Sequence, residues 1–513
     1  MLWSKTPERR KVAEIFEILK EKDPGKRLDG IPPLVGLGSR SPELLPELVD
    51  DENMYIRTSA AFAMSNVIRN IPELRHDLAG HAFEMLKHED YVIRTYAASL
   101  LGTAASVSPE SVVDIVPRLA NLVGEGGPQG YFACLAAGEI ALRCPTLVEP
   151  IMPKMMGFML LGEKPTCERS LIALERISRK APILLHKFVP ELMACIKKTK
   201  EPSMGLEAAV MLARVSISSS DVRRKSVWPL ASRLMGDESV IARAASVYLM
   251  GEIGLREPEL VMDAISQVPS FLQDNAAVRS LLAIAIGRIG SRLPVMAENA
   301  MPSIMRLIDD SDLLTRAAAA VSLRYIAMSY PEVLKEALPS IGALLEDSDP
   351  TKRGIAAIGV RLVASVSTEF NGEVMDRALD LIAERDVEAR RRTAVAFRMI
   401  SRCYHPEVDD GIITDITELL DDDDSTVRDN GLLAIRDIIS SYPDLAKEWA
   451  PRVAMMFNDR DSAVRAEAAY VIGEVAISDP ILAKHVALPG IIRLLDDEPS
   501  VSSNAAFSLG RIM

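Results

Sequence analysis

The chain is poor in aromatic residues and in cysteine. Aromatics make up 5% of its 513 residues although hydrophobic residues make up 48%, so a core has to be built mainly from aliphatic and small side chains. The cysteines form an odd set without a CxxC pair, which argues against a disulfide framework and against a zinc ribbon. No cofactor and no metal site is therefore expected. The five cysteines are Cys134, Cys144, Cys167, Cys195 and Cys403.

Long apolar runs and an excess of positive charge are also lacking. No apolar stretch approaches the roughly 18 residues that a membrane span needs, and residues 1–20 are charged rather than typical of a signal peptide. We therefore expect a cytoplasmic protein without a membrane span. The net charge of −13 disfavours nucleic acid as the partner. Charge is uneven, since residues 111–235 carry 17 Lys and Arg against 11 Asp and Glu, whereas residues 405–500 carry 8 against 21.

What the chain does contain is an internal repeat. An arginine follows a short, usually acidic turn, and adjacent members of the series are separated by 36 to 38 residues. One gap is close to four periods, and the flanking apolar pattern places Gly130, Cys167 and Gly205 inside it and Ser502 after the last arginine. These positions define thirteen units. The arginines are Arg57, Arg94, Arg243, Arg279, Arg316, Arg353, Arg390, Arg428 and Arg465.

Two further positions keep the same period. An acid stands six residues before the arginine at Asp51, Asp237, Asp310, Asp347, Glu384, Asp422 and Asp459. A proline stands fourteen residues before it at Pro229, Pro302, Pro339 and Pro451. Apolar residues after the arginine recur three and four apart, as on one face of a helix. Each unit is therefore predicted to be two short helices, the first bent by proline and the second capped by Asp or Asn.

The proline, acid and arginine at relative positions −14, −6 and 0 resemble the HEAT-repeat family. That resemblance implies an all-α fold, a right-handed α-solenoid (superhelix) of about 13–14 two-helix repeats that stack to bury their apolar faces. Residues 1–40 would form N-terminal capping helices, an atypical repeat, and residues 41–513 the solenoid, with irregular repeats at about 111–222. The resemblance also implies that the acids and arginines of neighbouring units form a structural ladder of hydrogen bonds.

Signatures of catalysis are not found in a matching context. No HExxH, GxSxG, Walker or Rossmann pattern occurs where its structural setting is predicted. The glycine-rich turn at residues 124–130 lacks the preceding strand and the following Lys-Ser or Lys-Thr of a phosphate loop. The acidic run at residues 421–424 lacks the glycine and final glutamate of an EF-hand. We therefore expect no enzymatic activity and assign no catalytic residue.

A partner-binding surface is predicted on the second helices. In HEAT-like stacks these helices line the concave side, and positions two and nine residues after the ladder residue share a face. Around units eight to ten this face is expected to present an apolar strip edged by arginines, followed by an acidic end that favours a partner with a basic segment. A rotation of one residue would instead place the strip in the core. The strip is Leu281, Tyr325, Ile355, Leu362 and Met399, the edge Arg288 and Arg392, and the acidic end Asp437, Glu467 and Glu474.

The function predicted from these features is that of a non-catalytic scaffold or adaptor that presents an extended concave surface to a protein partner. Similar HEAT proteins serve as transport receptors, phosphatase scaffolds, coat adaptins and chromosome-organising subunits. Two alternatives stay open. One is a HEAT-like enzyme or enzyme-accessory subunit, similar to a lyase or a DNA glycosylase. The other is a nucleic-acid clamp that uses the basic central repeats. The oligomeric state is left open.

Overall fold

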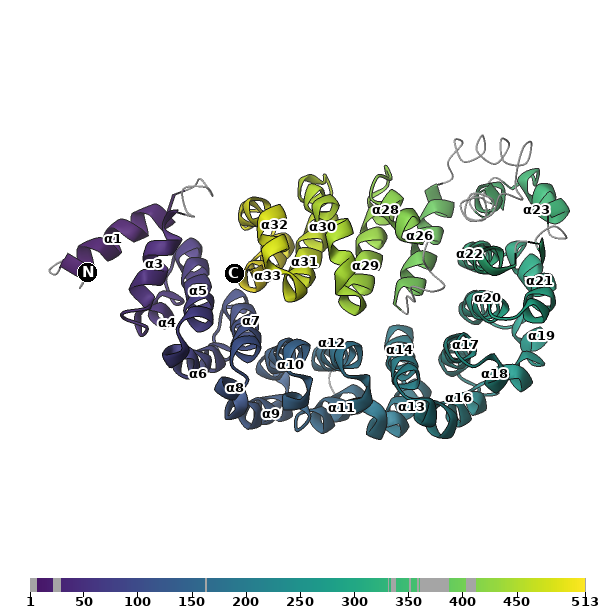
Figure 1. The fold of residues 1–513 in the computed structure, drawn as a ribbon, viewed down its shortest axis with the longest axis horizontal. Helices are drawn as coiled ribbons and strands as arrows, with labels where there is room; N and C mark the ends of the chain where they lie inside the picture. Colours follow the sequence, from purple (N-terminus) through teal and green to yellow (C-terminus); the bar gives the residue numbers. More distant parts are fainter. Residues whose placement is uncertain are drawn as a thin grey trace. The chain divides into compact units, whose positions relative to one another are not determined.

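The computed structural model describes residues 7–21, 29–161, 164–330, 332–333, 338–349, 352–357, 359, 387–402 and 412–512. Within these ranges all regular secondary structure is helical (Figure 1). The chain divides into two compact units. Unit 1 combines Met1–Leu184 with Ile439–Met513, and unit 2 is Leu185–Ile438. No helix in the described ranges is both long enough and apolar enough to cross a membrane.

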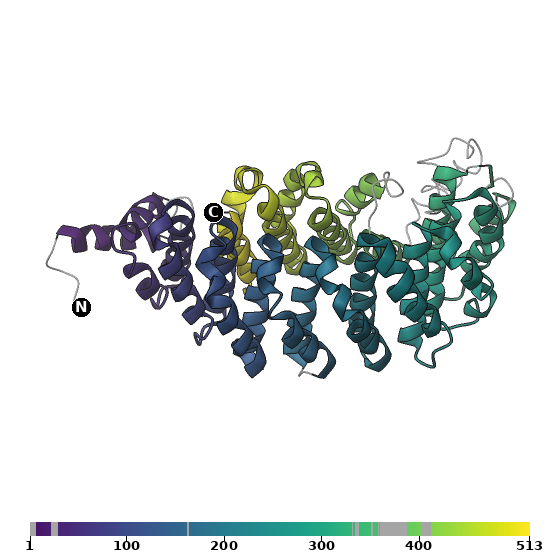
Figure 2. The same cartoon turned by 60° about the horizontal axis from the view of Figure 1, so that its bottom comes forward.

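The second helices of the repeats form one layer within each unit. In unit 1 they are α5 (Met54–Asn70), α7 (Tyr91–Val107), α10 (Gly127–Arg143), α12 (Lys164–Lys180), α31 (Ser462–Ser478) and α33 (Pro499–Ile512). In unit 2 they are α14 (Pro202–Ser218), α17 (Val240–Gly254), α20 (Ala276–Gly290), α22 (Leu313–Ser329) and α26 (Val387–Ser401), and α29 (Ser425–Ser441) begins there. Neighbours in this layer, such as α10 and α12, lie side by side (Figures 1 and 2).

The first helices form the other layer and are shorter. In unit 1 they are α4 (Leu44–Leu48), α6 (Arg75–Met85), α8 (Glu110–Val113), α9 (Ile115–Glu125), α11 (Met152–Leu161), α30 (Ala446–Met455) and α32 (Pro480–Leu494). Two further helices, α1 (Pro7–Leu19) and α3 (Ile31–Gly38), precede them, and α3 packs against α5. In unit 2 they are α13 (Val189–Lys198), α16 (Trp228–Leu234), α18 (Pro258–Ile265), α19 (Val268–Phe271), α21 (Pro294–Ile308), α23 (Leu338–Leu345) and α28 (Ile412–Leu419). Pro302 lies inside α21 and Pro451 inside α30, which confirms the predicted place of the proline.

Several second helices begin at polar caps, as the turn chemistry predicts, whereas α10 and α14 have no side-chain cap. The side chain of Asn53 accepts a hydrogen bond from the backbone N–H of Tyr55 at 2.9 Å, and Asp90 accepts one from Val92 at 2.7 Å. Asp312 and Asp461 cap α22 and α31 in the same way. Each cap satisfies a backbone donor that the first helical turn leaves without an intrahelical partner.

Small residues eight positions after the ladder residue let successive second helices approach closely. A Cβ atom added to Gly251 of α17 would lie 2.8 Å from Cα of Ala285 in α20. One added to Gly287 of α20 would lie 2.5 Å from Cβ of Ser322 in α22. Real Cβ atoms do not tolerate such distances, so glycine sets the spacing of these helices. This packing explains how a chain with few aromatic residues fills its interior.

Candidate protein-binding surface

The periodic arginines connect successive repeats. Arg243 donates from Nε and Nη2 to the carboxylate of Asp274 at 2.6 and 2.7 Å, and from Nη1 to the backbone carbonyl of Asp237 at 2.8 Å. Arg279 donates in the same way to Asp310, at 2.6 and 2.7 Å, and to the carbonyl of Asp274 at 2.5 Å. Each arginine therefore joins its own turn to the carboxylate of the next repeat. This is the geometry that the family resemblance implies.

Other members of the series make all or part of the same set of bonds. Arg390 reaches Asp422 and Arg465 reaches Asp497 through bidentate pairs, and Arg57 approaches Asp90 at 3.3 Å. For a further group, the bonds described go to backbone carbonyls of the residue's own turn, and Glu384 lies outside the described residues. The arginines of this group and the residues whose carbonyls they bond are Arg94 and His88, Arg316 and Asp310, Arg353 and Asp347, and Arg428 and Asp422. Arg57 and Arg465 also make this bond, to the carbonyls of Asp51 and Asp459.

The ladder shifts or stops where packing requires it. Asp274 and Asp497 stand five residues, not six, before the next ladder position, a shift that the sequence period did not predict. At Gly205 of α14 an added Cβ would overlap Cγ2 of Ile241 in α17, so a larger residue would have to displace that side chain. At Gly130 an added Cβ would lie 3.0 Å from the carbonyl oxygen of Leu122. Close contact with a neighbouring side chain at Gly205, and with a backbone carbonyl at Gly130, thus takes the place of the ladder arginine in these two repeats.

The apolar strip predicted on the second helices is not a surface. Leu281, Tyr325 and Ile355 are 7%, 1% and 1% exposed, so the expected outward orientation of these three side chains is wrong. The close approach of α20 and α22 explains the burial of Leu281 and Tyr325, because it leaves no room for solvent between the two helices. Leu362 lies outside the described residues. Met399 is half-buried.

The charged residues beside the strip are buried in part as well. Arg288 is 1% exposed and forms an ion pair with Glu252 of the preceding second helix. Asp437 is also buried and faces Arg402 at 3.8 Å. Neither Arg288 nor Asp437 is therefore available at the surface, contrary to the sequence-based expectation. Arg392 is exposed and pairs with Glu388 at 2.7 Å.

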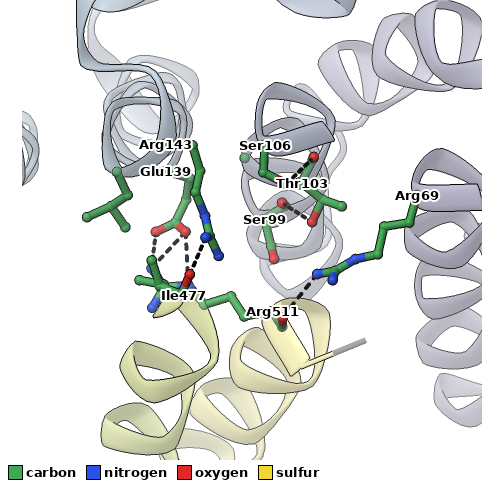
Figure 3. A pocket seen from close by; sticks show the side chains of 10 residues that line it. Arg69, Ser99, Thr103, Ser106, Glu139, Arg143, Ile477 and Arg511 are labelled. Carbon is green, nitrogen blue, oxygen red and sulfur yellow. Dashed lines mark hydrogen bonds and ion pairs between the residues drawn. The ribbon is translucent and has the colours of Figure 1, made fainter. Parts of the chain in front are cut away.

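Unit 1 contains a buried network of charges where side chains of α31 and α33 meet side chains of α10 and α12. Arg511 of α33 donates to Glu139 of α10 from Nε at 2.9 Å and from Nη2 at 2.5 and 2.7 Å (Figure 3). Its Nη1 donates to Glu474 of α31 at 2.9 Å. Arg176 of α12 bonds both Glu139 and the hydroxyl of Tyr470 in α31. Four helices are therefore joined through one set of ionised groups.

These partners keep the buried carboxylate of Glu474 ionised. Burial raises the pKa of Glu474, but the charges of Arg511 and Arg176 outweigh burial and lower it to about 2. Burial lowers the pKa of Arg511, whereas Glu139 and Glu474 raise it above its ordinary value. The carboxylate of Glu474 is consequently paired with arginines inside unit 1. It is not available to bind a basic partner segment, contrary to the sequence-based expectation. Glu467, two helical turns earlier on the same face, is half-exposed.

Two more arginines hold the carboxyl-terminal ends of α31 and α33. Arg69 of α5 donates to the backbone carbonyl of Arg511 at 3.1 Å, and Arg143 of α10 donates to that of Ile477 (Figure 3). The last carbonyls of a helix lack intrahelical donors and carry partial negative charge, so guanidinium groups suit them. A cavity of about 10 Å³ remains between these arginines and Ser99, room for about one water molecule.

Sequence reasoning found only part of this network. Glu139, Arg176, Glu474 and Arg511 all stand nine residues after a ladder position, so they belong to the predicted face. Only Glu474 was selected from them, because the sequence does not show which repeats meet. Arg69 and Arg143 stand twelve and thirteen residues after a ladder position, and no periodic signal marks them.

Unit 2 buries charges on the same layer. Arg324 of α22 pairs with Asp415 of α28 at 2.5 Å, and both are buried. Arg402, after α26, pairs with Glu207 of α14 at 2.7 Å, and its carbonyl accepts a hydrogen bond from Arg214 at 3.1 Å. Among the residues described, no group of three or more His, Cys, Asp or Glu is arranged to hold a metal ion. The buried charged groups described above thus pair with one another.

No family model matches the sequence, and no curated protein sequence matches it. Solved structures of the karyopherin Kap121p do match. Bound to the extreme C-terminus of the protein phosphatase Cdc14p, it aligns with a TM-score of 0.52 at 13% identity over 95% of this chain and 60% of that chain. Bound to Pho4p or to Nup53p, it aligns with a TM-score of 0.53 at 12% identity over 97% of this chain. The chain spans about 60% of the length of these structures. The likeness shows that the chain has the α-solenoid fold of the karyopherins.

Proposed function

We propose that this chain is a non-catalytic scaffold, of the transport-receptor type, that acts in the cytoplasm and binds protein partners along its second-helix layer. The observation that carries this proposal is the match to solenoids that were solved with proteins bound, over 95% or more of this chain. Stacked repeats set their second helices side by side in an extended layer, which can make contact with a partner over several repeats. The low sequence identity leaves the partner itself open.

Arginines of the basic central repeats are already paired with carboxylates, and this favours a protein partner over a nucleic acid. Arg223 and Arg224 both bond Glu257, at 3.1 and 2.7 Å. Arg179 bonds Glu175 at 2.5 Å. A guanidinium group that is already paired contributes less to the neutralisation of phosphates, which supplies most of the affinity of a nucleic-acid clamp.

The proposal is tested by affinity capture with the full chain, with and without nuclease treatment. We expect discrete proteins to be retained in both samples. Charge reversal at exposed Arg392 on α26 should weaken capture, whereas Met262→Ser on α18, in the first-helix layer, is the matched control and should leave it unchanged. Material that disappears with nuclease would instead assign the chain to nucleic-acid binding and refute the proposal.

A further inference from the structure

The N-terminal repeats present an excess of positive charge to α31 and α33. Arg69, Arg143 and Arg176 lie on α5, α10 and α12, and we call these three residues the arginine face. The same repeats contribute one carboxylate to the network, that of Glu139. If α31 and α33 moved away, Arg511 would leave with them, and the arginine face would keep a net positive charge.

The groups that now cover the arginine face are hydrogen-bond acceptors. Arg69 donates to a backbone carbonyl of α33, Arg143 donates to one of α31, and Arg176 donates to the hydroxyl of Tyr470. All three acceptors are neutral. The one carboxylate that α31 adds to the network, Glu474, bonds Arg511, although its charge also acts on Arg176. Guanidinium groups bind carboxylates more strongly than neutral acceptors and often through two parallel bonds.

The fit is also incomplete. Nε of Arg69 and Oγ of Ser99 are buried, and neither has a hydrogen-bond partner among the described residues. Burial and the nearby charge of Arg511 lower the pKa of Arg143 to about 10, so the packed state disfavours its charge. A ligand that brings negative charge would relieve both the unmet donor and the repulsion between arginines.

We propose that the arginine face is a binding site for an acidic peptide segment of a partner protein, and that α31 and α33 occupy it when no such segment is bound. The proposal rests on the protein-binding function proposed above and adds the location and the chemistry of one contact. Carboxylates of the segment replace the helix-end carbonyls on Arg69 and Arg143. The segment and the two helices therefore compete.

Contact between α33 and α7 offers a way to lock the covered state. A Cβ at Gly510 would lie 3.4 Å from Cβ of Ser99, close to the separation of about 3.5–4.5 Å in disulfides. The full chain with Ser99→Cys and Gly510→Cys should therefore form a disulfide that ties α33 to α7. A matched control is Gly473→Cys with Ser508→Cys, because a Cβ at Gly473 would lie 3.1 Å from Cβ of Ser508. The control disulfide joins α31 only to α33 and leaves both free to move together.

Binding is measured by fluorescence anisotropy with a labelled hexaglutamate peptide, with hexaglutamine as the uncharged comparison. We expect the reduced lock variant to bind hexaglutamate and not hexaglutamine. Oxidation should weaken binding by about tenfold or more, a change of about 1.4 kcal/mol, and reductant should restore it. The oxidised control variant should bind as its reduced form does. In the otherwise unchanged chain, Arg143→Gln should weaken hexaglutamate binding as well, which tests the site without new cysteines.

Several outcomes would overturn the proposal. These are equal binding by the oxidised and reduced lock variants, no binding of hexaglutamate by any form, and unchanged binding by Arg143→Gln. Lock-sensitive binding of a labelled oligonucleotide without binding of hexaglutamate would assign the face to nucleic acid instead. If the oxidised and reduced variants capture the same proteins, the scaffold function stands and only the arginine face is wrong. If neither captures any protein, the scaffold function itself fails.

Discussion

Removal of one ladder arginine should destabilise the stack in a local and measurable way. Arg279 makes two bonds to the carboxylate of Asp310 and one to the carbonyl of Asp274, and its side chain is 16% exposed. A hydrogen bond that involves a charge contributes about 1.5–3 kcal/mol, but bonds in one cluster are not additive. Asp310 also keeps a hydrogen bond from the backbone of Asp312. We therefore expect Arg279→Ala to lower the free energy of unfolding by about 2–3 kcal/mol.

The assay is denaturant unfolding combined with amide hydrogen exchange. Exchange should accelerate in α20, α21 and α22 and stay unchanged in α31, because the bonds of Arg279 lie within unit 2 and α31 lies in unit 1. Arg306→Ala, at an exposed position of α21 in the adjoining repeat, is the control and should have little effect. Arg353→Ala removes bonds to the carbonyls of Asp347 and Ser348 and should also destabilise the chain. Equal unfolding midpoints for the Arg279 and Arg306 variants would refute the structural role of the ladder.

Three further predictions concern pH, packing and dynamics. Hydrogen bonds, first that of Arg223, lower the pKa of Glu257 to about 2. The ionised carboxylate therefore stabilises the fold fully above about pH 4.3, and this contribution is lost as the pH falls toward 2. Glu257→Gln should remove that part of the acid dependence of the unfolding free energy, and an unchanged pH profile would contradict this prediction. Gly205→Ala should lower the free energy of unfolding by about 1–3 kcal/mol, because the added methyl group overlaps Ile241. Gly80→Ala, at a site in α6 with open space around it, should not lower it, and thermal melts of the two variants can be compared. Amide exchange should be faster in repeats three to five, where glycines interrupt the ladder, than in α29 to α31, and uniform protection would argue against it.

The local features of this fold could be predicted from the sequence because they repeat. The proline inside α21, the cap at Asp312 and the arginine at Arg279 each follow from the chemistry of one helix end or one turn, and the period aligns them. The alternation of two helices then follows from the apolar spacing.

The exposure of individual side chains could not be predicted in the same way. Leu281 and Tyr325 are buried because Gly287 lets two helices approach within contact of their backbones, and a rotation of one residue changes which side chains meet. The pairing of Glu139 with Arg511 joins residues 372 positions apart. Such a contact depends on the summed geometry of many repeats, which no single repeat encodes.

The most direct test of the scaffold account is photo-cross-linking from defined positions on the two layers. A photoreactive residue would replace Arg392 or Met399 on α26 in the second-helix layer, and Met262 on α18 or Val295 on α21 in the first-helix layer. The account predicts that discrete proteins cross-link to the α26 positions and not to those on α18 and α21. Protein cross-links confined to α18 and α21, with none from α26, would contradict it.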